Sequence, residues 1–331
     1  MKAFIPTALA CALMLIPLRA EGQTTVSGQT TVSGHTTVSG QTAVSGQTAE
    51  FSGISTRYFG PYAFPVPDLL DGRIHDGLQV ELSGDAVAGR AGGMENRDWT
   101  FAPTFRLNVP LWTDRVSFSI WGEFHEFYFD TPATREARNL APGALPLKSN
   151  DSGNLYFGIE IQALRERRLV PSVAVRATTL SATGDDHEAA RHYDAPGYFF
   201  DVSVGKSFLL GEKAGSIRLS GTAGFVCWQI GEGTQNDALL LGARLAWENR
   251  RAGLYVEYGQ YKGREKDLAA SCGIDSGDFP QSIKSRLSLH FGNFSPFIYL
   301  QYGFQDWPFT QFRLGLTWSF DLLGHFSAGA R

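Results

Sequence analysis

The sequence predicts an all-β fold, and three observations favour it. Apolar and polar residues alternate along many stretches of the chain, polar segments connect these stretches, and no apolar run after the N-terminal region is long enough for a transmembrane helix. Alternation is the period of a β-strand, because successive side chains point to opposite faces. A transmembrane helix needs roughly 20 consecutive apolar residues, so a helical membrane protein is excluded.

Residues 105–124, FRLNVPLWTDRVSFSIWGEF, show the alternation most clearly. Large apolar residues occupy every second position of two runs, and a polar turn joins the runs. The pattern predicts a hairpin with one apolar face, while the other face carries Arg106, Asn108, serines and Glu123. The apolar face contacts either a protein core or lipid.

The N-terminal region has the features of a secretory signal peptide, which we place at residues 1–20. Lys2 is followed by a mostly apolar stretch, and the small residue Ala20 precedes Glu21. A positive start, an apolar middle and a small residue at the exit are typical of such signals. The sequence therefore predicts export across a membrane.

Two segments separate the signal peptide from the first predicted strand. Residues 21–50 are a low-complexity tract of hexads such as QTTVSG, whose Thr, Ser, Gly and Gln residues cannot bury a core. We predict a flexible hexapeptide-repeat linker in the periplasm. Residues 51–75, which include YFGPYAFPVPDLLDG, are aromatic and rich in proline. This N-terminal segment either packs beneath the fold or enters it as a plug, and the sequence leaves both interpretations open.

Twelve alternating runs follow, and each predicts a strand. They are longer than the five or six residues that are usual in soluble strands, by roughly a factor of two, and reach the roughly 9–11 residues that a tilted membrane strand needs. The predicted strands are 77–88, 98–111, 115–129, 153–164, 169–180, 197–208, 216–230, 237–247, 252–262, 280–291, 295–304 and 310–322.

The connections between these strands differ in length. Those after the first, third, fifth and ninth strands are long and polar, and those after the second, fourth, eighth and tenth are short. Long loops on one rim and short turns on the other are typical of bacterial outer-membrane barrels. We therefore predict a closed antiparallel transmembrane β-barrel of about twelve strands over 76–322, with short periplasmic turns and long extracellular loops. Residues 323–331 form a C-terminal tail.

Over about residues 76–322 the chain resembles the twelve-stranded outer-membrane β-barrel proteins of Gram-negative bacteria. The amphipathic hairpins and the aromatic last strand QFRLGLTWSFDLL carry the resemblance, and STRYFGPYAFPVPDLLDGRI is similar to the start of uncharacterised outer-membrane proteins. The resemblance implies passage through the periplasm, insertion by the barrel assembly machinery, and a location in the cell outer membrane among lipid and lipopolysaccharide. Such barrels usually end on an aromatic residue, whereas here GHFSAGAR follows the last strand, so an assembly signal would be internal.

The inward face of the predicted barrel carries the side chains that would determine selectivity. Acidic and basic residues occur there in similar numbers, so the sequence indicates no ion preference. The candidate lumen-lining residues are Glu81, Asp85, Arg106, Glu123, His125, Glu160, Arg176, Asp201, Arg218, Arg244, Glu257, Lys284, Arg286 and Arg313.

Two interpretations of these charges stay open. In a closed barrel, opposite charges on neighbouring strands, such as Arg106 beside Glu123 or Glu257 beside Arg286, would form a structural ladder of salt bridges. In a porin or channel, the mixed charges would line a path for small polar solutes. A twelve-stranded lumen is only moderately wider than that of the eight-stranded barrels that side chains fill, and it allows both.

A porin or channel is the function that we predict first, and the alternative is a closed structural or surface-interaction barrel that acts through its extracellular loops. A third candidate is an outer-membrane lipid hydrolase, which needs a serine, a base and an orienting group within hydrogen-bond reach. We expect His125 to face inward, and no histidine shares an outward position near the rim with a serine. We therefore predict no enzyme and no catalytic residues.

Neither a metal site nor a cofactor is indicated by the sequence. No spacing of histidines and cysteines matches a metal site, and we interpret residues 185–194, DDHEAARHYD, as a solvated loop. A net charge of −4 argues against a nucleic-acid partner. Small solutes are the expected ligands, and the sequence indicates no oligomeric state.

Overall fold

The computed structural model describes residues 59–74, 77–90, 97–111, 114–137, 146–185, 189–193, 195–229, 235–263 and 279–320, without the side chains of 229 and 235–237. The predicted signal peptide, the hexad linker, the first residues of the N-terminal segment and the C-terminal tail lie outside these ranges. No described helix is both long and apolar enough to span a membrane.

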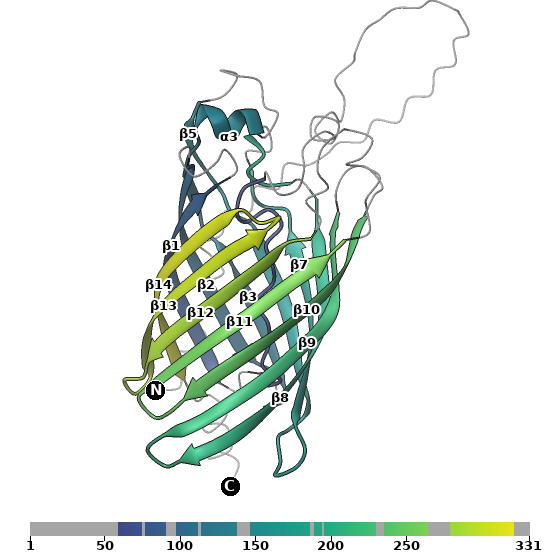
Figure 1. Ribbon diagram of the computed structural model, residues 1–331, viewed down its shortest axis with the longest axis vertical. Coiled ribbons are helices and arrows are strands. Elements are labelled where there is room, and N and C mark those ends of the chain that lie inside the picture. The colour runs from purple at the N-terminus through teal and green to yellow at the C-terminus, as the bar shows by residue number, and fades with distance from the viewer. Residues whose placement is uncertain are drawn as a thin grey trace, which may run out of the picture. The chain divides into compact units, whose positions relative to one another are not determined.

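The described strands form one antiparallel sheet that closes on itself (Figure 1). A short helix, α3 (Pro132–Ala137), lies in one of the connections. The strands are β1 (Leu78–Gly89), β2 (Trp99–Pro110), β3 (Val116–Glu123), β4 (Glu126–Phe129), β5 (Lys148–Asp151), β6 (Leu155–Leu164), β7 (Ser172–Ser181), β8 (Gly197–Gly211), β9 (Gly215–Gln229), β10 (Gln235–Glu248), β11 (Ala252–Lys262), β12 (Gln281–Leu289), β13 (Phe294–Gln305) and β14 (Phe309–Phe320).

Closure of the sheet comes from β1, which pairs with both β2 and β14. β2 pairs with β3 and, further along, with β4. β6 pairs with β3 and β5 pairs with β4. β3 and β4 together therefore occupy one position around the wall, and β6 and β5 together occupy the next, so the fourteen strands make a twelve-strand barrel. The predicted all-β fold and the closed twelve-strand barrel are confirmed.

The two faces of the wall differ in the way that the alternation predicts. On β14, Phe312, Leu314 and Leu316 are exposed on the outside, while Gln311 and Thr317 are buried on the inside. Exposed large apolar side chains likewise cover the outer face of the other long strands. A shift of one residue in register would exchange the two faces, because the period of a strand is two. An outer surface that is apolar to this extent is typical of a barrel surrounded by lipid.

A one-residue bulge separates β3 from β4. Thr104 of β2 lies opposite Glu123, whereas Phe101 lies opposite Phe127, so β2 advances three residues (104 to 101) while its partner advances four (123 to 127). The extra residue reverses the alternation beyond it. The prediction that His125 lines the lumen is therefore wrong: its ring lies against the exposed Phe127 on the outer face, with the ring centroids 4.8 Å apart.

The two ends of the barrel differ in their connections. At one end, the short-turn end, strands are joined by residues 111–115, 165–171, 212–214, 249–251 and 290–293. The other end, the loop end, carries the connections 90–98, 130–147, 182–196, 230–234, 263–280 and 306–308. In the turn before β13, Gly292 adopts a φ of 61°, a left-handed conformation that glycine accepts without strain. This arrangement agrees with the predicted asymmetry, although two of the loop-end connections are short.

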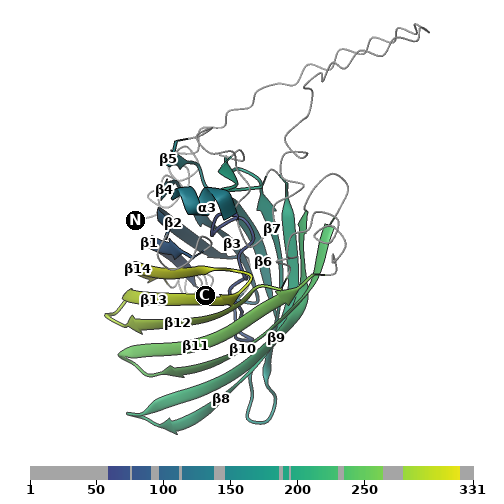
Figure 2. The ribbon, with the colours of Figure 1, turned by 45° about the horizontal axis from the view of Figure 1, so that its top comes forward.

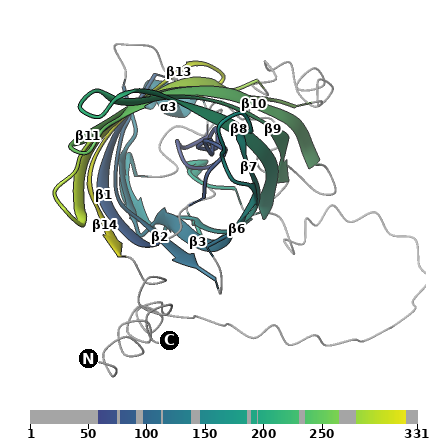
Figure 3. The same ribbon diagram turned by 90° about the horizontal axis from the view of Figure 1, so that it is seen from below.

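The buried apolar core lies inside the barrel. Residues 59–74, which precede β1, lie within the lumen, where Figures 2 and 3 show them as a dark purple segment surrounded by the wall. Phe64 and Leu69 of this segment pack in one buried cluster with Leu240 and Tyr261 of the wall. The structure therefore places this part of the N-terminal segment in the lumen and not beneath the barrel.

A charged residue introduced on the outer face should destabilise the barrel by an amount that depends on its depth in the bilayer. Leu241 faces outward near the middle of β10, and Leu241→Arg should lower the free energy of unfolding from a lipid bilayer by roughly 2–4 kcal/mol, because the midplane does not hydrate the guanidinium. Leu210→Arg, at an exposed outward site near the short-turn end, is the control and should cost roughly 0–1 kcal/mol. Urea titration of protein folded into vesicles measures both, and equal costs would contradict the lipid-facing assignment.

Candidate functional site

Residues 59–74, called the lumen segment below, cross the barrel from the loop end to the short-turn end. Near its start, the backbone amide of Gly60 donates a hydrogen bond of 2.8 Å to the carbonyl of Ala190, in a loop-end connection. Near its end, the backbone amide of Ile74 donates to Oε1 of Gln162 at 3.1 Å, close to a short turn. The chain then reverses direction into β1, which begins at the short-turn end.

The lumen segment forms no strand or helix, so its backbone needs partners from elsewhere. Its prolines lack an amide donor and disfavour a helix, and buried carbonyls require hydrogen bonds. Side chains of the barrel wall and of the loop end supply the donors. The carbonyls of Pro61, Phe64, Val66, Asp68, Leu69, Leu70, Asp71 and Gly72 accept hydrogen bonds from the side chains of Trp307, Tyr261, Lys284, Arg176, Arg244, Thr222, Arg218 and Gln162, respectively.

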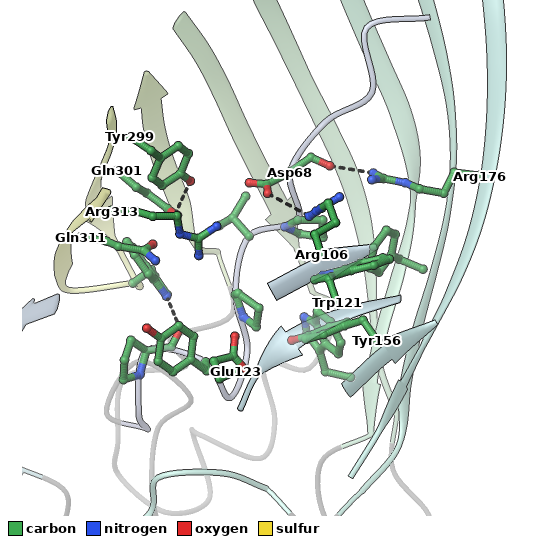
Figure 4. A pocket seen from close by; sticks show the side chains of 18 residues that line it. Asp68, Arg106, Trp121, Glu123, Tyr156, Arg176, Tyr299, Gln301, Gln311 and Arg313 are labelled. Carbon is green, nitrogen blue, oxygen red and sulfur yellow. Dashed lines mark hydrogen bonds and ion pairs between the residues drawn. The ribbon is translucent and has the colours of Figure 1, made fainter. Parts of the chain in front are cut away.

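Asp68 of the lumen segment forms ion pairs with two cations of the wall (Figure 4). Its Oδ1 lies 2.7 Å from Nζ of Lys284, and its Oδ2 lies 3.5 Å from Nη2 of Arg106. Lys284 is buried and is also 3.6 Å from a carboxylate oxygen of Glu257. Because a buried ammonium is stable only when it is paired, the two carboxylates together stabilise the charge of Lys284. The lumen segment thus contributes an acidic partner to cations of the wall.

The structure places the predicted lumen residues, with the exception of His125, on the inner side of the wall, and many of them form ion pairs. Opposite charges neutralise one another locally, so neither sign dominates the inner surface. The pairs and their N–O distances are Arg176 with Asp201 (2.7 Å), Arg218 with Glu166 (2.6 Å), Arg244 with Glu257 (2.5 Å), Arg286 with Glu81 (2.9 Å) and Arg313 with Asp85 (2.5 Å), while Glu160 accepts a hydrogen bond from Ser117 (3.4 Å).

The two salt bridges that the sequence suggested between neighbouring strands are wrong. Arg106 reaches Asp68 in the lumen segment instead of an acid of the adjacent strand. Glu257 lies directly opposite Arg244 in the strand register and pairs with it instead of with Arg286. The strand register and the lumen segment determine which charges pair. The alternation along one strand gives no information about either of them.

A second group of charges, which the sequence interpretation missed, lies at the loop end. Arg191 is fully buried, and its Nε lies 2.8 Å from Oε1 of Glu126. Its Nη1 lies 3.7 Å from Asp130 and 3.9 Å from Asp98. The interpretation of DDHEAARHYD as a solvated loop is therefore wrong for Arg191 and for its buried neighbour His192.

The bulge explains why this cluster was missed. If the alternation continued unchanged beyond Glu123, Glu126 would face outward. The extra residue turns Glu126 inward, toward Arg191. Burial by itself would lower the pKa of Arg191, but the surrounding carboxylates raise it, so the guanidinium stays charged. Because Ala190 accepts the hydrogen bond from Gly60, the cluster also anchors the outer end of the lumen segment.

A cavity of about 90 Å³ remains between the lumen segment and the wall (Figure 4). Trp121 and Tyr156 stack along it with their ring centroids 5.3 Å apart, and the guanidinium of Arg106 lies 4.6 Å from the centroid of Trp121. Glu123 also lines the cavity, and its buried Oε2 has no hydrogen-bond partner among the described residues. The cavity is large enough to hold ordered water, so a small polar space remains beside the lumen segment.

The described histidines lie away from this space or are already paired. Nε2 of His125 lies 2.9 Å from Oδ1 of Asn150 on the outer face. Nδ1 of His290 lies 3.0 Å from Oγ of Ser295 at the short-turn end. In the part of the chain that the structure describes, no group of three His, Cys, Asp or Glu side chains could hold a metal ion.

Comparisons with known proteins show the fold of the chain. No protein-family model matches it, and no curated protein sequence matches it. A solved outer membrane channel from Pseudomonas putida F1 superposes with a TM-score of 0.51 at 14% identity, over 77% of this chain and 100% of that one. The KdgM porin (TM-score 0.41, 9% identity, 72% and 99% covered) and the NanC porin (0.47, 8%, 73% and 100%) are more distant. The chain therefore has the fold of an outer-membrane β-barrel.

The loop-end cluster predicts a large stability effect of one substitution. Arg191→Met should lower the free energy of unfolding by about 3–5 kcal/mol, because it leaves buried carboxylates without their cation. Arg168→Met, at an exposed position in the turn before β7, is the control and should change stability by less than about 0.5 kcal/mol. Urea titration followed by tryptophan fluorescence compares the two, and similar small effects would show that the cluster does not stabilise the loop end.

Proposed function

We propose that the protein is an outer-membrane channel for small polar solutes and that the lumen segment closes it in the described conformation. The observation that carries the proposal is the set of hydrogen bonds from wall side chains to the backbone of the lumen segment. Water can replace such bonds at a small net cost, since a typical bond contributes about 0.5–1.5 kcal/mol and one from a charged donor about 1.5–3 kcal/mol. The wall is therefore suited to contact with water as well as with the segment.

Opposing free-energy terms act on the lumen segment. Ordering the backbone costs about 1–2 kcal/mol per residue, which is comparable with the contribution of each hydrogen bond that holds it. The free energy that retains the lumen segment is thus a difference between large opposing terms. A change in either term shifts the equilibrium between the closed and the open state. Burial of Phe64, Val66 and Leu69 in the apolar cluster adds to the hydrogen bonds that hold the segment in the lumen.

The character of the outer surface supports our placement of the channel in an outer membrane. The apolar outer face suits lipid, and the short turns would lie in the periplasm while the longer loops lie outside the cell. Lipid and lipopolysaccharide would contact the outer face, and the barrel assembly machinery would insert the chain. Solutes would then pass along the charged inner wall.

A closed barrel that acts through its loops is the second candidate. The buried cluster around Arg191 supports it, because the cluster holds the loop end and the start of the lumen segment together. The inner wall favours the channel, because a permanently sealed barrel has no need for cations that reach a removable segment. The two candidates differ in what happens when the segment is absent.

A lipid hydrolase is the third candidate, and the described residues favour the channel over it. Hydrolysis by a nucleophile requires a hydroxyl beside its base. On the outer face, Phe127 and not a serine shares the face of His125 two residues along, and Asn150 is the hydrogen-bond partner of the ring. His290 and Ser295 lie together at the short-turn end, and among the described residues no hydrogen bond to Nε2 of His290 orients the ring.

Deletion of residues 59–74 should raise the single-channel conductance across a planar bilayer, because water and ions then occupy the lumen. The full-length protein is the reference and should conduct little. Heat-modifiable migration on gels would verify that both proteins fold as barrels. Equal conductance of the two folded proteins would contradict closure by the lumen segment and favour a closed barrel.

A reversible crosslink tests the same closure without a deletion. A side chain added at Gly259 would place its Cβ 3.0 Å from Cγ1 of Val66, so Val66→Cys together with Gly259→Cys brings two thiols within reach of a disulfide. In a background without Cys227 and Cys272, oxidation should abolish channel openings and a reductant should restore them. The single substitutions are the controls. Openings that persist after the disulfide has formed would show that the segment is not the gate.

A further inference from the structure

We propose that the cavity between the lumen segment and the wall binds a small zwitterion, a molecule with one carboxylate and one ammonium group, of which glycine is the simplest example. The ligand carboxylate binds Arg106, and the ligand ammonium binds Glu123. The proposal deepens the proposed function and rests on it where it names the solute of the channel. Binding itself requires only the described conformation, so it can be measured without passage.

Glu123 is a buried carboxylate without a cation. It is the last residue of β3, it lines the cavity, and only 8% of its surface is exposed. Its Oε2 has no hydrogen-bond partner in the part of the chain that the structure describes, and no ion pair among those residues includes Glu123. Burial of a carboxylate is costly unless a positive charge or a proton neutralises it. Glu123 is therefore suited to a cationic group that a ligand brings.

Arg106 is the most weakly paired of the three arginines that line the cavity. The other two, Arg176 and Arg313, lie 2.7 Å and 2.5 Å from carboxylates of the wall. The partner of Arg106, Oδ2 of Asp68, lies 3.5 Å away, beyond the usual distance of about 2.7–2.9 Å for a charge-assisted hydrogen bond. Asp68 is also shared with Lys284. The guanidinium of Arg106 can therefore donate to a second carboxylate.

The two groups lie on either side of Trp121 on the inner face. Arg106 of β2 is opposite Trp121 of β3, and Glu123 follows two residues later on the same face. Arg106 and Glu123 are thus diagonal neighbours, roughly 7–8 Å apart along the backbone. The guanidinium lies over the ring of Trp121 and does not pair with Glu123 (Figure 4). Separate groups of opposite charge, with an aromatic face between them, match the two ends of a zwitterion.

The size of the cavity restricts the ligand further. Its volume is about 90 Å³. An engineered protein cavity of about 150 Å³ binds benzene. Glycine has fewer non-hydrogen atoms than benzene and is therefore of a suitable size, whereas a sugar ring with its hydroxyl groups is too large.

Two further polar groups favour a zwitterion over a simple ion. Oη of Tyr156 and Nε1 of Trp228 are buried, belong to residues that line the cavity, and have no hydrogen-bond partner among the described residues. Both can donate a hydrogen bond, so they suit the ligand carboxylate as Arg106 does. A simple anion would leave Glu123 without a cation, and a simple ammonium ion would leave these donors without an acceptor. A zwitterion satisfies both sets.

Equilibrium dialysis of the full-length protein, folded in detergent, with isotopically labelled glycine tests the proposal. Acetate, which lacks the ammonium group, and methylammonium, which lacks the carboxylate, are the competitors. Glycine should bind at least about tenfold more tightly than either competitor, because each of them leaves buried polar groups unpaired. Acetate as effective as glycine would show an anion site only, and methylammonium as effective as glycine would show a cation site only. Either result, or the absence of glycine binding, would overturn the proposal.

Two substitutions with matched controls assign the ends of the ligand. Glu123→Gln should weaken the binding of glycine and methylammonium by about tenfold or more and spare acetate, and Arg106→Gln should weaken glycine and acetate and spare methylammonium. A general change in the barrel would not produce this crossed pattern. Glu212→Gln and Arg168→Gln, at exposed positions in short turns, should leave all three affinities unchanged. Unchanged glycine affinity in either folded cavity variant would contradict the assignment.

The test can fail independently of the channel. Heat-modifiable migration verifies the fold of each variant, and the comparison of the three ligands on the unaltered protein holds even where a variant does not fold. Glycine binding by a protein that gains no conductance on deletion of residues 59–74 would support the site and contradict the channel. A gain of conductance without glycine binding would support the channel and contradict the site.

Discussion

The backbone of the lumen segment is the constraint on which the interior of the barrel depends. An extended chain inside a barrel directs carbonyl groups to several sides, and each buried group needs a donor. Long side chains of the wall, such as Arg176, Arg244 and Lys284, reach from the wall to the segment and meet much of this need. The inner cations are thus organised about the segment as well as about the acids of the wall.

The arrangement of polarity is the reverse of that in a soluble protein. Apolar side chains cover the outside, and ion pairs such as that between Arg176 and Asp201 are buried inside. A charge in such a place costs several kcal/mol unless it is paired, and the register of neighbouring strands supplies partners for many of the wall charges. The wall therefore keeps its own ion pairs, while the backbone contacts of the lumen segment are additional. Asp68 of the segment adds a further partner for two of the wall cations, Arg106 and Lys284.

A single extra residue in the wall has consequences at the loop end. Beyond the bulge between β3 and β4, His125 faces outward and Glu126 faces inward. The inward carboxylate meets Arg191, and the connection that carries Arg191 holds Gly60 at the start of the lumen segment. A local irregularity of the backbone thus helps to determine where the lumen segment begins its path through the barrel.

By itself the sequence determined the all-β class, the positions of the strands and the inward face of most of them, because a period of two is a local property of the chain. The last strand illustrates this: the pattern predicts 310–322, and β14 runs from Phe309 to Phe320. Only the tertiary structure decided the position of the bulge. The bulge shifts the inward–outward alternation by one residue and leaves the composition of the strand unchanged. It also decided the path of residues 59–74 and the pairing of Asp68 with Arg106, which are 38 residues apart. These depend on which groups the closed barrel brings together, and no local pattern contains that information.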